Sequence, residues 1–331
     1  MRNDMKKLRL PVHIQAFLWA AFTPLFPIQA QPLLEIETVL VGDAANAPDI
    51  TGYGAVAYDF SIGKYEVTIG QYAVFLNSVA SVTSEAYLVD LWQKKMGDDV
   101  RIKGISRTGS GTKEQPYRYS VVGSSNRPIS YVSWLDAARF ANWMHNGATN
   151  GASTETGAYN LNGAVSGIIK KNTGAKWWIP SEDEWYKAAY YKGGSKAAGY
   201  WLYPMQSNDS PGNVVGKGAN QANFWKGVFS VTQSADYPTQ TSLSEVGAFT
   251  NSPSAYGTYD QGGNVLEWND AVIGEFSRGL RGGDWNGNEL GLQSPTRGDG
   301  GNGAPTYKDD DIGFRLATLP QPSAGALLRR R

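Results

Sequence analysis

Glycine content is the feature that most constrains how this chain can fold. The 331 residues include 39 glycines, and a glycine inside a helix costs about 1 kcal/mol relative to alanine. We therefore expect much loop and turn, with a modest amount of regular structure. The stretch RGLRGGDWNGNELGL, residues 278–292, concentrates this property. It predicts either a tight corner of a glycine-rich fold or the loop of an active site.

Two chemically important residue types are absent or scarce. The chain has no cysteine, which excludes disulfides, thiolate metal sites and cysteine nucleophiles. Its two histidines are His13 and His145, and His13 lies in an expected leader. The position of His145, late in an amphipathic segment, predicts a structural cation at a helix C-terminus rather than a catalytic base.

The charge balance gives no reason to expect nucleic acid as a partner. Lys and Arg together number 30, as do Asp and Glu, so the formal net charge is zero. No linker divides the chain after its first residues, and we therefore expect a single main body.

The N-terminus has the pattern of an export signal. Basic residues precede a mostly apolar run over 12–26, and Ile28-Gln29-Ala30 provides a small-residue cleavage site. We predict a signal peptide at 1–30 and a secreted or cell-envelope protein. A membrane anchor is the alternative, but the run is shorter than the roughly 20 residues that a span needs. No membrane span is expected in the mature chain.

The body shows an α+β pattern. A lead-in over 31–50 includes strand-like alternation at 37–41, and residues 55–60 and 63–67 are predicted strands. Three helices are predicted from capping pairs that precede apolar faces: Thr68 with Gln71, Ser133 with Asp136, and Ser181 with Glu184. Residues 104–123 and 147–174 are expected to be loops, and irregular β structure is expected after Tyr200.

Six segments occur in an order that resembles one known family. They are SIGKYEVTIGQYAVFLNSV, RPISYVSWLDAARFANWM, WWIPSEDEWYKAAYY, GTYDQGGNVLEWND, RGLRGGDW and DIGFRLA. Together they resemble the formylglycine-generating enzyme, or sulfatase-modifying factor, domain, over residues 51–318. The resemblance implies an α+β, loop-rich variant of the C-type lectin fold.

The tail at 319–331 resembles a Pro-Glu-Pro sorting signal of bacterial envelope proteins. It has Gln321 in place of the Glu, three final arginines and little of the apolar span. An ordinary basic tail is the alternative interpretation.

The resemblance also locates the chemistry that this chain lacks. Active members of the family bind copper(I) through two cysteines after the Arg-Gly-Gly motif, and thiolates suit that soft ion. Those positions are Gly287 and Leu292 here. Copper is therefore not expected, nor is cysteine oxidation by the family mechanism. The three-histidine iron site of related enzymes is excluded too, because only His145 would remain in the mature chain.

Calcium is the metal that the resemblance predicts. The segment YDQGGNVLEW matches a family calcium site, whose ligands by position would be Asp260, Gly263, Val265 and Glu267. Carboxylate and carbonyl oxygens suit this hard cation. In the alternative interpretation Asp260 caps a turn, and Glu267 pairs with a buried arginine, Arg281 or Arg315. A fainter second site would use Asn223, Phe224 and Asp236.

Two further features bear on ligands. The resemblance places a ligand groove beside Trp285, together with Asn286 and Asn288. The large aromatics, Trp225 among them, are expected in the core. The acids Asp309-Asp310-Asp311 indicate a solvated turn or a cation site.

Three functions follow as hypotheses, and the third of them is a structural envelope component with no small ligand. The first is a non-catalytic, calcium-stabilised binding protein of the cell envelope, whose ligand would be a peptide, a glycan or another envelope protein. The second is an enzyme of the family's fold that uses a different chemistry or a partner chain.

Overall fold

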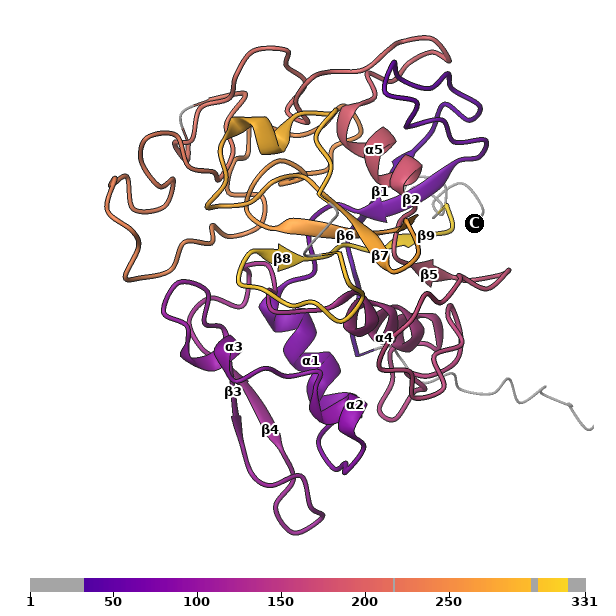
Figure 1. Cartoon of the computed structure of the whole chain (residues 1–331), viewed down its shortest axis with the longest axis vertical. Coiled ribbons are helices and arrows are strands. Elements are labelled where there is room, and N and C mark those ends of the chain that lie inside the picture. Colours follow the sequence, from indigo (N-terminus) through magenta and orange to yellow (C-terminus); the bar gives the residue numbers. More distant parts are fainter. Residues whose placement is uncertain (1–32, 217, 299–302, 321–331) are drawn as a thin grey trace, which may run out of the picture. The chain divides into compact units, whose positions relative to one another are not determined.

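The computed structural model describes residues 33–216, 218–298 and 303–320 (Figure 1). All of them belong to the unit Pro32–Arg331. The predicted signal peptide and most of the predicted sorting tail lie outside the described residues. Within those ranges, no helix is long and apolar enough to cross a membrane.

The three predicted helices are confirmed, as are their starting points. They are α1 (Ile69–Val79), α4 (Trp134–His145) and α5 (Glu182–Tyr190), and each begins with a complete capping box. In α1 the Thr68 hydroxyl accepts a hydrogen bond from the Gln71 amide, and the Gln71 side chain accepts one from the Thr68 amide. These reciprocal bonds satisfy backbone donors that a helix leaves unpaired at its start.

Helices α1 and α4 form the centre of the main core. Phe75 of α1 contacts Phe140 and Trp143 of α4, with ring centroids 5.1 and 5.4 Å apart. Phe140 also meets Phe314, near the end of the body, at 5.4 Å. The core therefore joins the first and the last elements of the described part of the chain.

A four-stranded antiparallel sheet ties the beginning of the body to its end. Its order is β1 (Thr38–Val41), β2 (Phe60–Gly63), β9 (Ala317–Thr318) and β5 (Trp177–Trp178). The strand-like alternation at 37–41 is confirmed. The strands predicted at 55–60 and 63–67 are wrong in their limits, because β2 spans the junction between them, where it pairs with β1 and β9.

The loop predicted at 104–123 is wrong. The segment forms a hairpin of β3 (Ile105–Thr108) and β4 (Arg118–Val121), which extends from the body in Figure 1. Ile105 and Tyr119 bury one face of the hairpin, although polar and glycine residues dominate the segment. Two one-turn helices precede it, α2 (Ala86–Val89) and α3 (Lys95–Asp98). They are too short for a hydrophobic period to reveal them.

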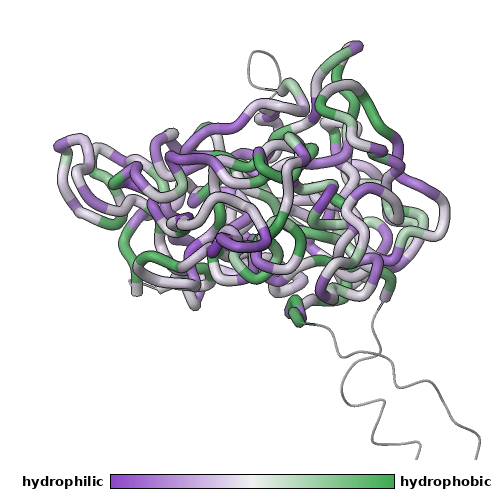
Figure 2. The backbone as a smooth tube through the Cα atoms, turned by 90° about the horizontal axis from the view of Figure 1, so that it is seen from below, coloured by the Kyte–Doolittle hydropathy of each residue, from purple (hydrophilic) through white to green (hydrophobic). Residues whose placement is uncertain are grey.

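A third sheet positions the segments of interest. Strand β6 (Leu266–Ile273) pairs antiparallel with β7 (Ser277–Arg281) and parallel with β8 (Ile312–Gly313). A 3₁₀ turn, η1 (Glu289–Leu292), follows β7. Glu267 lies opposite Arg281 across the sheet. The rest of the chain after Tyr200 is mostly loops. Along the backbone as a whole, hydrophobic and hydrophilic residues alternate over short distances (Figure 2). The α+β, loop-rich class is confirmed.

Two individual predictions need correction. His145 does end α4, but its Nδ1 accepts a hydrogen bond from the Lys176 amide at 3.0 Å, so that nitrogen carries no proton. Burial and Lys176 lower the pKa of His145, and the predicted helix cation is therefore wrong. Trp225 is 40% exposed instead of lying in the core, because the loop that carries it follows the surface.

Candidate functional site

The turn after β7 is built around a buried arginine. Arg281 donates through Nε to Glu182 at 2.8 Å and through Nη1 to the carbonyls of Ser294 and Thr296, both at 2.9 Å. Its guanidinium is fully buried. An arginine so placed fixes the path of the loop, because its planar donors bind several acceptors at set angles.

The glycines that follow allow close packing at this turn. Gly283 has φ +71°, and an added Cβ would lie 2.8 Å from Cδ1 of Leu292. Gly282 has φ +106° and approaches Trp185. Both conformations favour glycine. The motif therefore serves the fold here.

The two positions predicted to lack the family cysteines lie in different environments. The Gly287 amide donates to Oδ1 of Asp284 at 2.8 Å, and its carbonyl accepts from the Trp225 amide at 2.9 Å. Leu292 is fully buried in a small apolar cluster with Tyr203, Met205, Ala222 and Phe224. Neither side chain can bind a metal.

The surface beside Gly287 combines aromatic and amide groups. Asn286 and Asn288 are exposed, whereas the Trp285 ring is only 1% exposed and lies beneath Tyr237, with centroids 6.2 Å apart. Tyr237 itself is 55% exposed, and Trp225 is partly exposed. We call Trp225, Tyr237, Asn286 and Asn288 the aromatic-amide surface.

Glu267 takes part in a buried ion pair. Arg315 donates to both of its carboxylate oxygens at 2.7 Å, and Trp185 Nε1 donates to Oε2 at 2.8 Å. Both charged side chains are fully buried. This is the pairing with Arg315 that the sequence left open as an alternative, and it occupies the oxygens predicted to bind calcium.

Two further acids lie near this ion pair. Asp260 has φ +58° and its Oδ2 accepts from the Gly247 amide at 2.6 Å. Burial raises the pKa of Asp260 to about 6, against the influence of that bond and of Arg315. Glu66 is 1% exposed, and burial together with Asp260 raises its pKa well above the ordinary range. Three carboxylates thus surround one arginine.

An asparagine links the two segments predicted to bind calcium. Asn264 donates from its amide nitrogen to Oε1 of Glu66 at 3.2 Å, and its Oδ1 accepts from the Asn223 side chain at 3.0 Å. In the described part of the chain, Oε2 of Glu66 and Oδ1 of Asn223 are buried without a hydrogen-bond partner. We call Glu66, Asn223, Asp260, Asn264, Glu267 and Arg315 the central polar cluster.

The remaining predicted ligands are placed as follows. Gly263 and Val265 flank Asn264, and the Gly263 amide donates to the Gly282 carbonyl at 2.9 Å. Phe224 is fully buried, and its carbonyl accepts from Asn213 at 3.2 Å. Asp236 is exposed. The structure therefore brings Asn223 to the first predicted site and leaves Asp236 at the surface.

The Arg281 turn lies within a region that matches one family model. Residues 49–319 match the sulfatase-modifying factor enzyme 1-like domain. The chain belongs to this family. The resemblance inferred from the six segments is thereby confirmed.

Two curated proteins are similar to this chain in sequence. The formylglycine-generating enzyme of Thermomonospora curvata is 28% identical over 225 residues, which cover 63% of this chain and 58% of the relative. The inactive C-alpha-formylglycine-generating enzyme 2 of Mus musculus is 31% identical over 200 residues, or 58% of this chain and 49% of the relative. The chain thus spans only about half the length of these curated relatives.

The structural comparison concerns the fold alone. Treponema denticola variable protein 1 superposes with a TM-score of 0.50 at 20% identity, over 87% of this chain and 96% of the other. This chain therefore shares its fold with a protein of distant sequence.

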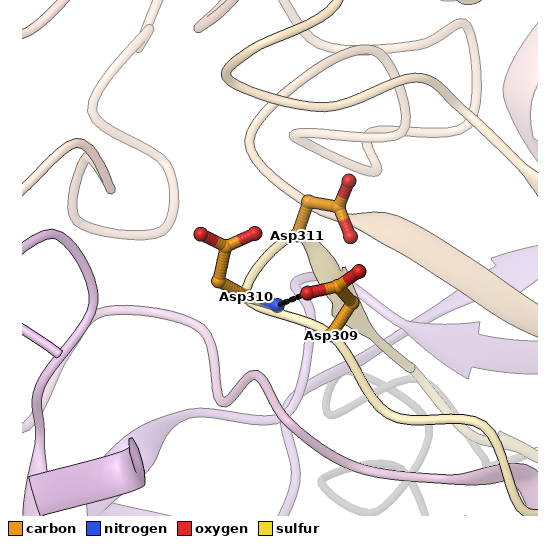
Figure 3. Close-up of side chains that lie close together, drawn as sticks. All are labelled: Asp309, Asp310 and Asp311. Carbon is orange, nitrogen blue, oxygen red and sulfur yellow. Dashed lines mark hydrogen bonds between the residues drawn. The ribbon is translucent and has the colours of Figure 1, made fainter. Parts of the chain in front are cut away.

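An acidic turn of this family member precedes β8. One group of three or more His, Cys, Asp or Glu side chains in the described residues has its ligand atoms all within 4.8 Å of one another. It consists of Asp309, Asp310 and Asp311. Figure 3 shows them on consecutive residues, with the Asp310 amide donating to Asp309 at 2.9 Å. Burial, followed by the charge of Asp284, raises the pKa of Asp311 to about 8. No described atom besides these acids marks the turn as a metal site.

Sequence reasoning missed four residues of these sites: Glu66, Asn264, Trp225 and Tyr237. Glu66 was overlooked, although a single acid within the otherwise uncharged run YEVTIG is an unusual feature. The exposure of Trp225 and Tyr237 has no local sequence signal, because it depends on which loops cover them.

Proposed function

We propose that this protein is a non-catalytic binding protein that is exported to the cell envelope and stabilised by calcium. The observation that carries the proposal is the burial of Leu292. One family cysteine position has become part of an apolar cluster, and the other is a glycine. No cysteine elsewhere in the chain can replace them, so the copper chemistry of the active relatives has no thiolate ligands.

The aromatic-amide surface is the proposed binding site. Exposed Trp and Tyr rings present large, rigid contact areas, and amides provide both donors and acceptors. Such a surface suits a glycan or a peptide. Loops on a fixed scaffold commonly perform recognition, and Arg281 holds this loop in place.

Glycan and peptide arrays would test the binding proposal. A specific ligand should bind the wild type, and Trp225→Ala should reduce binding by about tenfold or more, because buried aromatic contacts dominate such interfaces. Phe276→Ala is a matched control, since Phe276 is 74% exposed in the turn between β6 and β7. An absence of reproducible binding to both arrays would contradict the proposal. Stoichiometric copper or iron in purified protein would instead favour the alternative, an enzyme of different chemistry.

Calcium is proposed to bind at the central polar cluster. Two observations support this site. Three buried carboxylates surround the single cation of Arg315, and one oxygen each of Glu66 and Asn223 is buried without a hydrogen-bond partner in the described chain. Because Glu267 is occupied by Arg315, the ligands would come from Glu66, Asn223 and Asp260 with backbone carbonyls near Gly263 and Val265. The ion would offset buried negative charge and stabilise the fold.

Calorimetric titration of metal-stripped protein with calcium would test this site. We expect saturable binding and a higher Tm, and Glu66→Gln should weaken binding by about tenfold or more. Glu289→Gln is the control, because Glu289 lies in η1, outside the cluster. If calcium produced no heat of binding and no change in Tm, the proposed site would be ruled out.

A further inference from the structure

A hollow of about 280 Å³ lies on the face formed by the segment after β4 and residues 239–241. Its charged lining residues are Lys103 and Arg127. Thr239, Gln240 and Thr241 also line it and supply polar groups from two hydroxyls and an amide. None of the described residues that line it is acidic. The hollow is therefore a positively charged, donor-rich site.

The two cations are not neutralised by neighbours. Within the described ranges, neither Lys103 nor Arg127 has a carboxylate oxygen within 4.0 Å of a side-chain nitrogen. Two acids of neighbouring segments are engaged elsewhere. Asp99 pairs with Arg101 at 2.7 Å, and Glu245 accepts from the Ser124 hydroxyl at 2.7 Å.

Two buried polar atoms of the lining have no partner. Among the described residues, nothing forms a hydrogen bond with Nε of Arg127 or Oγ1 of Thr241, although both atoms are inaccessible to solvent. Nearly all buried polar atoms in folded proteins are hydrogen-bonded. Arg127 and Thr241, both of which line the hollow, therefore keep hydrogen-bonding capacity that the described chain does not use.

A glycine leaves room beside the arginine. Gly123 has φ +81°, and an added Cβ would lie 3.4 Å from Nη1 of Arg127, with no second atom within 4 Å. A side chain here would be strained and would contact the guanidinium. The glycine keeps that side of Arg127 open.

We propose that this hollow binds a tetrahedral oxyanion, a sulfate or phosphate group. A guanidinium presents parallel donors that match two oxygens of such a group, and an ammonium and hydroxyls can reach the others. The volume is near the lower limit of small-molecule sites, which leaves space for a sugar-sized group that carries the anion as an ester. The inference does not depend on calcium or on the aromatic-amide surface.

Thermal unfolding and calorimetry with inorganic sulfate and inorganic phosphate would test the site, with sodium chloride at matched ionic strength as the reference. We expect a saturable rise in Tm and a heat of binding for at least one oxyanion. Arg127→Gln and Lys103→Gln should each weaken binding by about tenfold. Arg118→Gln, at an exposed arginine of β4, should leave it unchanged. Lys103 is exposed, so its variant is expected to fold.

Galactose 6-sulfate and galactose would separate the two sources of the anion. Tighter binding of the sulfated sugar than of inorganic sulfate would assign the hollow to an ester, and the reverse order would assign it to the free anion. The proposal is overturned if the oxyanions act only as chloride does. It is equally overturned if Arg127→Gln and Lys103→Gln bind like the Arg118 control.

Discussion

In the first part of the body, the rings of Phe75, Phe140 and Trp143 join two capped helices. After Tyr200, arginines occupy the comparable interior positions, with Arg281 and Arg315 both buried against carboxylates. Many backbone carbonyls in loops have no partner in a helix or sheet, and a buried carbonyl needs a hydrogen-bond donor. The guanidinium groups of Arg281 and Arg315 are such donors. Their acceptors include the carbonyls of Ser294, Thr296, Gly63 and Tyr259.

The difference implies two kinds of sensitivity. An apolar core loses stability in proportion to the contacts and volume removed. A buried charge that loses its partner costs more, because the remaining charge is desolvated and uncompensated. Single polar substitutions should therefore affect the loop-rich part most.

Arg315→Met should have the largest effect. It leaves Glu267 buried without its cation, and we expect the free energy of unfolding to fall by about 3–5 kcal/mol. Urea denaturation measures it. The double variant Arg315→Met, Glu267→Met should recover a large part of the loss, since an apolar pair carries no uncompensated charge. A double variant no more stable than the single one would show that the loop-rich part depends on packing instead.

Leu76→Ala tests the helical part. Leu76 is fully buried on α1, and removing its branched end should lower the free energy of unfolding by about 3 kcal/mol. Val82→Ala, at a 48% exposed position, should change stability by less than about 0.5 kcal/mol. The comparison would fail if both variants unfolded at the same urea concentration.

Ser133→Ala tests how much the capping box of α4 contributes to the free energy of unfolding. The variant removes the hydroxyl that accepts from the Asp136 amide at 3.1 Å, and we expect a loss of about 1 kcal/mol. Ser110→Ala, at an exposed loop position, is the control in the same denaturation series. Equal midpoints for the two variants would mean that the capping box contributes little to α4.

Asp311→Asn should have an effect that depends on pH and that vanishes near pH 4. The folded pKa of Asp311 is raised to about 8, above the unfolded value of about 4. The neutral carboxyl therefore stabilises the fold below pH 4, and this contribution is lost as pH rises through 8.

The variant keeps a neutral group at every pH. In chelator, its Tm should match the wild type near pH 4 and exceed it at pH 9. Calorimetric scans at the two pH values measure this difference. A lower Tm for the variant at pH 9 would mean that the Asp311 charge is stabilising.

Local signals explain what the sequence predicted correctly. A capping box depends on residues three apart in the sequence. The starts of three helices could therefore be predicted locally, at Thr68, Ser133 and Ser181. The β3–β4 hairpin depends instead on burial of Ile105 and Tyr119 against α1 and its neighbours, which no local pattern records.

The candidate sites were predictable to different degrees. The absence of thiols at Gly287 and Leu292 follows from residue identity alone. The choice of Arg315 over Arg281 as partner of Glu267 does not, because both arginines meet β6 through long-range contacts and only three-dimensional packing selects one. Glu66 became relevant for the same reason, through Asn264, which lies 198 residues away along the chain.

The burial of Leu292 has a consequence for anyone who would restore copper to this scaffold. Placing thiols at 287 and 292 would also replace a leucine that fills the space under Gly283 and contacts Phe224 and Met205. A cysteine at 292 is smaller than leucine and would leave a cavity in that cluster, so the engineered site would be less stable than its surroundings are now. A working copper site would therefore require further substitutions that refill the apolar cluster, in addition to the two cysteines.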